Sequence, residues 1–346
     1  MHMADALLSP MVGATMWAGS MATIGYSSRK LKENIDNKTI PLMGVMGAFI
    51  FAAMMINFTI PGTGSSGHIG GGMILTVILG PYAAFLVLAS VLMVQAFFFA
   101  DGGLLALGCN IWNLGIYPCF IAYPLIYKPI AGNGTNAKRI YIAAIVSVII
   151  ALQLGAFSVV LETLLSGRSE LPFNTFVLLM QPIHLAIALV EGIVTAGIIS
   201  YVKNIRPELL EASIESRPLD AGISTKNFMV TFVVLAVFTG GAISWFASTH
   251  PDGLEWSIEK VTGKGELAGQ KSGIAPILKA IQEKTAFLPD YNYNLNPVAK
   301  EEPKNNEAPV WPGIEAGTSV AGLVGGTIVL MFIIFIGFGI RFLKKQ

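Results

Sequence analysis

Four histidines are the clearest candidates for chemistry in this 346-residue chain: His2, His68, His184 and His250. Motifs for other chemistries are missing: the sequence has no phosphate-binding loop with its lysine, no HExxH zinc-protease motif and no histidine paired with a serine or cysteine nucleophile. The run GTGSSG at 62–67 satisfies a GxGxxG pattern, but apolar spans flank it instead of the strand and helix that dinucleotide binding requires. We therefore expect no enzymatic activity, and no ATP hydrolysis by this chain itself.

His2 occupies the position at which a chain terminus can chelate a metal ion. Three nitrogens are available together: the Met1 α-amine, the His2 backbone amide and the His2 imidazole, which close two fused chelate rings in one plane. Bulky His2 should prevent removal of Met1. Binding the amide nitrogen requires its deprotonation by a strongly polarising ion, and planar nitrogen ligation is diagnostic for Cu(II) or Ni(II). The competing interpretation is a frayed terminus without function.

His68 lies in a glycine-rich segment, 63–72, on the same side of the membrane as the N-terminus according to the charge pattern described below. Glycines let a backbone approach a ligand closely. The imidazole of His68 can supply the fourth nitrogen that the terminal chelate lacks. The alternative is a flexible external turn with an incidental histidine.

A few further polar residues are candidates for supporting roles. His184 and Glu191 are seven residues apart in an apolar span, so a helix brings them to one face; a hydrogen-bonded structural pair and a supporting or ion-release role both remain open. Asp101 begins an Asp-Gly-Gly turn and either orients a ligating imidazole or caps a helix. His250 belongs either to a turn or to an ion relay.

The composition determines the class of protein that must position these groups. Hydrophobic residues make up 53% of the chain and charged residues only 12%, whereas soluble domains carry about 25% charged residues. The chain is therefore predicted to be an all-α polytopic membrane protein. A net charge of +1 gives no sign of nucleic-acid binding, and two cysteines in apolar stretches cannot form a disulfide framework. The first residues do not resemble a removable signal peptide.

The positive residues indicate how the chain crosses the membrane. Eight apolar stretches approach the length of a span: 6–28, 41–58, 81–100, 104–127, 139–165, 176–202, 228–248 and 319–342. Four groups of lysines and arginines, at 29–38, 128–139, 203–226 and 341–345, fall on one side only if the shorter stretch 70–80 crosses as well. Since such residues gather in cytoplasmic loops, we expect nine crossings, an external N-terminus and a cytoplasmic C-terminus.

This topology divides the chain into three parts. Residues 1–202 are predicted to form a seven-helix bundle, 203–227 a polar cytoplasmic linker, and 228–346 a two-helix transmembrane hairpin with a long external loop. The external residues 250–317, which contain the sequence VAKEEPKNNEAP, have a partly disordered composition.

Several of these residues resemble motifs of the CbiM/NikM family, the substrate-capture components of nickel and cobalt energy-coupling-factor transporters. MHMADALLSP at 1–10 is similar to the family's MHIPDGFLSP, and 57–68 is similar to its NFPIPGTSGHL-type loop. Asp101-Gly-Gly, Asn110 and the stretch from Gln181 to Glu191 resemble later motifs, which adds Asn110 to the candidates for a supporting role. Residues 228–346, with HPDGLEW at 250–256, look like a small N component fused to the bundle.

The resemblance implies a function, a cargo and partners. It implies that Met1, His2 and His68 hold the ion, that the ion is transported Ni(II), with Co(II) as the alternative, and that no organic cofactor is needed. It also implies a transmembrane coupling (T) protein, ATP-binding cassette ATPases and a place in the cell membrane of a prokaryote. The rivals are a stand-alone channel or secondary transporter and a membrane metalloenzyme.

A ridge of small residues in the first span is a candidate contact for such a partner. Ala14, Ala18 and Ala22 recur every four residues, and small residues on one helix face allow close helix approach in membranes. Packing inside the bundle explains the same spacing. In the family, a ridge of this kind meets the coupling protein.

Overall fold

A computed structural model describes residues 2–35, 38–134, 136–167, 171–215, 225–264, 267, 269, 272–293 and 312–344. These residues are mostly helical, as predicted, and they also contain a two-stranded antiparallel hairpin. The elements before the hairpin are η1 (Asp5–Leu7), α1 (Pro10–Asn34) and α2 (Thr39–Met54). The hairpin is β1 (Asn57–Ile60) and β2 (Ser65–His68).

The remaining helices follow in chain order. Up to the predicted linker they are α3 (Gly72–Leu79), α4 (Pro81–Phe99), α5 (Leu107–Ile111), η2 (Trp112–Tyr127), α6 (Lys128–Ala131), α7 (Ala137–Ser166), α8 (Phe173–Ile205) and α9 (Pro207–Glu215). The C-terminal region comprises α10 (Lys226–Gly241), η3 (Ile243–Phe246), α11 (Gly253–Thr262), α12 (Ile274–Thr285), η4 (Pro289–Tyr291) and α13 (Ala316–Lys344).

Local sequence explains where several of these helices begin and how they turn. The Ser9 side chain accepts a hydrogen bond from the Val12 N–H at 3.3 Å, and Pro10 occupies the first helical position of α1. η2 is a wide-turned π-helical stretch that contains Pro118 and Pro124. Proline has no N–H to donate and clashes with the carbonyl one turn earlier, which disturbs regular α-helical bonding there.

Helix length and composition make this a multi-pass membrane protein. Among the described residues, α4, α7, α8 and α13 are long and apolar enough to cross a membrane, and α2 and α10 are shorter apolar helices. α3 has only eight residues, about 12 Å, and cannot by itself cross a hydrocarbon core of about 30 Å. The predicted count of seven bundle helices and a hairpin is therefore not established by helix length.

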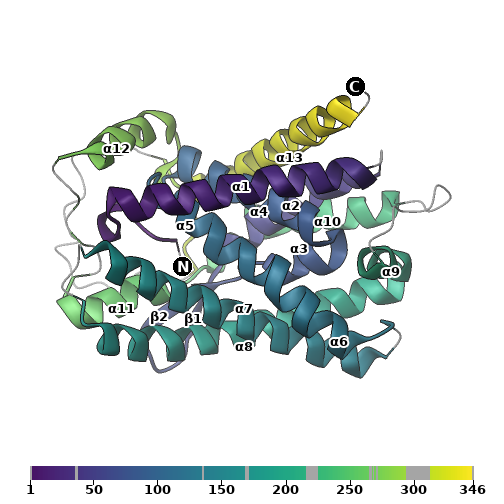
Figure 1. Ribbon diagram of the computed structural model, residues 1–346, viewed down its shortest axis with the longest axis horizontal. Helices are drawn as coiled ribbons and strands as arrows, with labels where there is room; N and C mark the ends of the chain where they lie inside the picture. Colours follow the sequence, from purple (N-terminus) through teal and green to yellow (C-terminus); the bar gives the residue numbers. More distant parts are fainter. Residues whose placement is uncertain are drawn as a thin grey trace.

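The positively charged segments lie together at one end of the molecule. In Figure 1, α6 and α9 lie at one end and α11 and α12 at the other. The Lys128 ammonium of α6 donates to the Ile214 carbonyl of α9 at 2.8 Å, and Lys344 at the end of α13 donates to the Glu33 carbonyl of α1 at 3.1 Å. α3 leads to this end, because the Ser213 hydroxyl of α9 donates to its Thr76 carbonyl at 3.3 Å.

The predicted linker and external segment contain more structure than their composition suggests. α9, inside the predicted linker 203–227, packs against α3 and α8 and buries Leu209 and Leu210. α11 and α12 are helices within the external segment. Residues 298–309, with the sequence VAKEEPKNNEAP, lie outside the described part of the chain.

The C-terminal region docks on the bundle through α13, which packs along α2, while α10 packs against both. The two C-terminal helices approach each other at glycines: a Cβ on Gly322 would lie 2.4 Å from the Gly240 carbonyl oxygen. Close backbone approach at small residues is typical of helix contacts in membranes. The C-terminal helices are thus built to lie close together against the bundle.

Candidate metal centre

The N-terminal segment is held inside the protein from its second residue. Met3 is fully buried, its N–H donates to Asn110 Oδ1 at 2.8 Å, and its carbonyl accepts from the Gly103 N–H at 2.9 Å and from Asn110 Nδ2 at 3.4 Å. Asp5 accepts from the Ala106 N–H at 3.0 Å. Asn110, a predicted supporting residue, thus fixes the main chain that directly follows His2. Met1 lies outside the described residues.

His68 ends an ordered hairpin and does not lie in a flexible turn. β1 and β2 pair in an antiparallel register that sets Asn57 opposite His68. A Cβ on Gly67 would lie 2.4 Å from the Cγ1 atom of Ile187 in α8. The glycine before His68 is therefore needed for packing against α8, whereas the sequence pattern suggested approach to a ligand.

His2 and His68, 66 positions apart in the chain, come together in the structure. Their ring centres are 5.2 Å apart and their planes differ by 4°. His2 Nδ1 lies 3.1 Å from Asp101 Oδ1, and His2 Nε2 is buried without a hydrogen-bond partner. A buried nitrogen without a hydrogen-bond partner is uncommon, and this one is available to bind a ligand.

The charge states around this pair suit cation binding. Burial lowers the pKa of the His68 imidazole to about 3, so the ring is neutral near pH 7, as metal ligation requires. Burial opposes ionisation of Asp101, but the neighbouring His2 and hydrogen bonds from His2 and Tyr291 outweigh it and hold the pKa of that carboxyl well below its usual range. Asp101 is therefore an anion beside His2.

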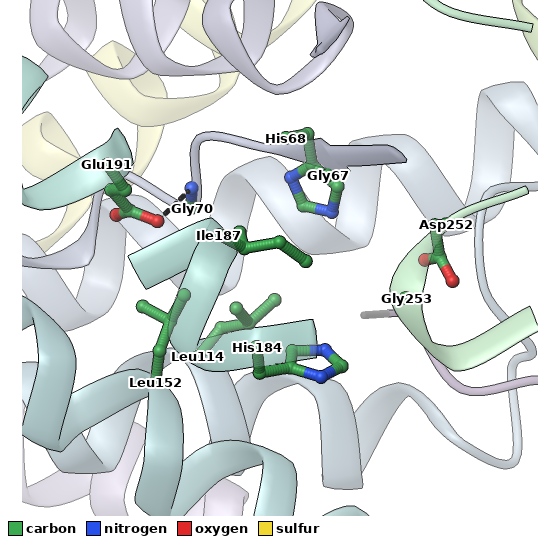
Figure 2. A pocket seen from close by; sticks show the side chains of 10 residues that line it. All are labelled: Gly67, His68, Gly70, Leu114, Leu152, His184, Ile187, Glu191, Asp252 and Gly253. Carbon is green, nitrogen blue, oxygen red and sulfur yellow. Dashed lines mark hydrogen bonds between the residues drawn. The ribbon is translucent and has the colours of Figure 1, made fainter. Parts of the chain in front are cut away.

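Glu191 anchors the chain immediately after His68. Its two carboxylate oxygens accept hydrogen bonds from the Gly70 and Gly71 N–H groups, each at 2.9 Å, and Figure 2 shows one of these bonds. Bonds from N–H groups to a carboxylate are stronger than those between neutral groups. The sequence spacing correctly put Glu191 and His184 on one helix face but could not reveal these partners.

His184 faces a small cavity beside His68. Its Nδ1 donates to the Met180 carbonyl at 2.8 Å, and its Nε2 is buried without a hydrogen-bond partner. The cavity has a volume of about 20 Å³, and its lining includes His68, His184, Glu191, Asp252 and Gly253 (Figure 2). This volume is about that needed for a single water molecule.

The C-terminal region forms one wall of the cavity. Asp252 caps α11 by accepting from the Leu254 and Glu255 N–H groups at 2.8 and 2.9 Å, and Glu255 bonds back to the Asp252 N–H. The Ser66 N–H of the hairpin donates to the Pro251 carbonyl at 2.8 Å. The His250 side chain is exposed, and its carbonyl accepts a hydrogen bond from the Ser66 hydroxyl of the hairpin.

The sequence did not predict two side chains that contact residues around the candidate metal centre, those of Glu162 and Tyr291. Glu162 of α7 is 5% exposed and accepts from Asn113 Nδ2 at 2.8 Å, close to the Met3 sulfur. Its signal was available, since an acid within an apolar span is rare and often functional. Tyr291 contacts Asp101 from a polar segment without any motif, and no pattern in the sequence could have found it.

The ridge Ala14, Ala18 and Ala22 is exposed on α1, with Met11 and Met21 beside it. The opposite face of α1 is buried in the bundle, where Ser20 and Ser27 are fully covered. The structure therefore does not support the alternative interpretation, in which this ridge packs inside the bundle.

The fold is that of an integral membrane protein, and its candidate site holds two partly buried imidazoles side by side, at the end of the molecule away from its basic segments. Comparison with known families makes the assignment specific. The model of the CbiM family, the cobalt uptake substrate-specific transmembrane region, matches residues 2–209, and that of the PDGLE domain matches residues 226–342. The chain belongs to the CbiM family and carries a PDGLE domain after it.

Known relatives agree with this assignment. A proposed fused nickel transport protein, NikMN, of Archaeoglobus fulgidus is 30% identical over 95% of this chain and 96% of its own length. The fused nickel transport protein NikMN of Rhodobacter capsulatus is also 30% identical, over 84% of this chain and 88% of its own length. A crystal structure of a transition metal transporter matches with a TM-score of 0.53 and 30% identity, over 61% of this chain and 96% of that one.

Proposed function

We propose that this chain captures Ni(II) at high affinity, as the substrate-specific subunit of an ATP-driven energy-coupling-factor importer, with Co(II) as the alternative cargo. The observation that carries the proposal is the pairing of His2 and His68, with parallel rings 5.2 Å apart, beside the anion Asp101. One ion about 2 Å from a nitrogen of each ring can bridge the two side chains.

The proposed ligands are the Met1 α-amine, the His2 amide and imidazole, and the His68 imidazole. Within the described residues, no three histidine, cysteine, aspartate or glutamate side chains are grouped to hold a metal. The proposed set therefore draws its other nitrogens from the main chain.

The His2 ring must turn for the fused chelate to close. Only Nδ1 can close a ring with the amide of the same residue, yet Nδ1 faces Asp101 and the free nitrogen is Nε2. A half-turn about the Cβ–Cγ bond exchanges Nδ1 with Cδ2 and Nε2 with Cε1. It turns Nδ1 away from Asp101 towards the ion and brings Nε2–H to the side of the ring that faces this carboxylate. A carboxylate bonded to the outer nitrogen of a ligating histidine fixes its tautomer and raises its basicity.

Nickel is favoured over cobalt by two considerations. The fused relatives that match most of this chain are nickel transport proteins, and planar nitrogen ligation suits Ni(II). Cobalt stays a candidate because the family description names cobalt uptake and a cobalt transport protein, CbiM, of Sorangium cellulosum is 25% identical over 61% of this chain and 95% of its own length.

The proposed orientation has the metal site outside and the basic end in the cytoplasm. It is supported by the grouping of Lys128, Lys344 and α9 at the end of the molecule opposite α11 and α12 (Figure 1), since positive residues gather in cytoplasmic loops.

The proposed partners are a transmembrane coupling protein, which would bind the exposed ridge Ala14, Ala18 and Ala22, and ATP-binding cassette ATPases. Ala18→Trp should leave nickel bound to the purified chain but abolish co-purification with the coupling protein and nickel uptake. Gly197→Trp, at an exposed position of α8 with open space around it, is the matched control. Uptake by Ala18→Trp at the wild-type rate would remove α1 from the interface.

Elemental analysis and a visible spectrum of the purified chain test the proposal as a whole. We expect one nickel per chain and the yellow, diamagnetic species that planar nitrogen ligation gives. Cobalt in its place would establish the alternative cargo. Uptake into vesicles that contain this chain alone, without ATPases, would favour the stand-alone transporter, and a chain that binds neither ion would overturn the proposal.

A further inference from the structure

One tyrosine of the C-terminal region contacts the candidate metal centre at Asp101. The Tyr291 hydroxyl donates to Asp101 Oδ2 at 2.5 Å and accepts from Gln95 Nε2 at 3.0 Å. The other oxygen of the same carboxylate, Oδ1, lies 3.1 Å from His2 Nδ1. A single carboxylate thus joins a hydroxyl from the PDGLE domain to the imidazole at the start of the chain.

The direction of these hydrogen bonds is fixed by their partners. Gln95 is fully buried, and its amide nitrogen can only donate. The hydroxyl oxygen therefore accepts from Gln95 and has its one proton left for Asp101. Chains of bonds aligned in this way strengthen one another in a poorly hydrated interior.

The tyrosine is held firmly in this position. Its ring stacks on Phe99, with centres 5.0 Å apart and planes 18° apart, and meets the Phe51 ring edge-on. Its backbone φ is +59°, and that of Asp290 is +54°. Left-handed conformations in residues other than glycine are strained, and they persist only where the surroundings impose them.

The same segment also grips the turn that carries Asp101. Gln282 of α12 donates to the Ala96 carbonyl at 2.9 Å and to the Gly102 carbonyl at 2.7 Å. The Leu288 N–H donates to the Phe98 carbonyl at 3.3 Å. The C-terminal region thus holds the backbone on both sides of Asp101 as well as its carboxylate.

We propose that Tyr291 is a positioning residue for metal capture: its hydroxyl holds the Asp101 carboxylate against His2, so that the PDGLE domain sets the orientation of the N-terminal ligand. The inference rests on the proposed function, because it assigns His2 to the bound ion. It holds for either His2 nitrogen, because the carboxylate contacts Nδ1 in the structure and the proposed half-turn brings Nε2 to the side of the ring that faces it. Movement of the η4 segment away from the bundle would free the carboxylate and loosen the ligand.

The test uses the full-length chain and Ni(II) as the titrant. Tyr291→Phe keeps the ring on Phe99 and removes only the hydroxyl, and we expect nickel affinity to fall about 10- to 100-fold, the usual cost of losing such a supporting bond. The thermal unfolding temperature of the metal-free protein should change little. Tyr293→Phe, at an exposed tyrosine two residues later, is the matched control and should bind nickel like the wild type.

A double-mutant cycle separates positioning from general packing. Asp101→Asn should also weaken binding, and adding Tyr291→Phe to Asp101→Asn should cost little more, because the hydroxyl acts through that carboxylate. If the two losses are additive, the tyrosine acts independently of Asp101, and the inference is wrong.

The remaining outcomes are equally decisive. Wild-type affinity in Tyr291→Phe would show that the hydroxyl positions nothing, while leaving metal capture intact. A wild-type chain that binds neither Ni(II) nor Co(II) would remove the proposed function and this inference with it.

Discussion

Replacing Glu191 by glutamine tests whether the chain after His68 must be anchored for metal capture. The carboxylate accepts from the Gly70 and Gly71 N–H groups at 2.9 Å each. Glutamine has the same shape but offers one neutral acceptor, and its NH₂ group meets the second N–H as another donor. One bond is therefore lost and the other is weakened.

The expected magnitude follows from these two bonds. A hydrogen bond to a charged group contributes about 1.5–3 kcal/mol, so we expect the anchored conformation to lose about 2–3 kcal/mol. Since about 1.4 kcal/mol corresponds to a factor of ten, its population relative to open conformations falls about 30- to 150-fold. The nickel affinity falls in proportion to the fraction of molecules in the anchored, binding-competent conformation. We therefore expect a loss of nickel affinity of about 10- to 100-fold.

The assay is calorimetric titration of nickel together with hydrogen exchange of the peptide that contains residues 68–72. Exchange of the Gly70 and Gly71 amides should accelerate in Glu191→Gln, because local opening becomes easier. Glu283→Gln is the control, since Glu283 is 66% exposed and only pairs with Lys279 at 4.0 Å, a contact worth about 0.3–0.5 kcal/mol. Wild-type affinity with wild-type exchange in Glu191→Gln would refute the anchoring argument.

Three further predictions concern the terminus, acid stability and helix packing. One residue added before Met1 should leave folding intact but abolish tight nickel binding, as measured by elemental analysis; stoichiometric nickel would exclude the terminal chelate. The folded pKa of His68, about 3, lies below the unfolded value of about 6.5, so the unfolded state takes up the proton first. Through this group, the free energy of unfolding of the metal-free protein should fall by about 1.4 kcal/mol per pH unit from pH 6 to 4, and His68→Asn should remove that part of the slope in denaturant titrations. Gly322→Val should lower thermal stability by about 1–3 kcal/mol or more through overpacking against Gly240, whereas Gly339→Val, with open space around it, should not; equal melting temperatures would contradict the close helix approach.

The sequence predicted the class of this protein well because membrane composition and helix-length apolar stretches are local properties. It also identified His2 and His68 as partners from their residue types and the charge pattern. The structure brings their rings together, and their role as metal ligands stays a prediction. The crossing at 70–80 was harder to predict, since α3 is an eight-residue helix that follows a partly buried hairpin and is too short to be a full span.

Contacts between distant segments were beyond the reach of the sequence. Glu191 and the Gly70 amide are 121 positions apart, and Tyr291 and Asp101 are 190 positions apart. No periodicity or motif encodes such pairs. The start of α11 is different, because Asp252-Gly-Leu-Glu255 has the spacing of a capping box and could have been read as a helix start within the external segment.

The contact between residues 248–252 of the PDGLE domain and the β1–β2 hairpin is favoured because both belong to the same chain. The Ser66 N–H donates to the Pro251 carbonyl, and the Ser248 N–H donates to the Asn57 carbonyl at 2.7 Å, so residues 248–252 are hydrogen-bonded to both strands of the hairpin. Because both belong to one polypeptide, their contact forms within one molecule, at an effective concentration that reaches the millimolar range where the connection is short and flexible. A docking free energy of only about −4 kcal/mol then keeps the contact half occupied. A fused chain can therefore use a contact that opens readily and still re-forms without waiting for diffusion, which two separate proteins at cellular abundance could achieve only with a much tighter interface.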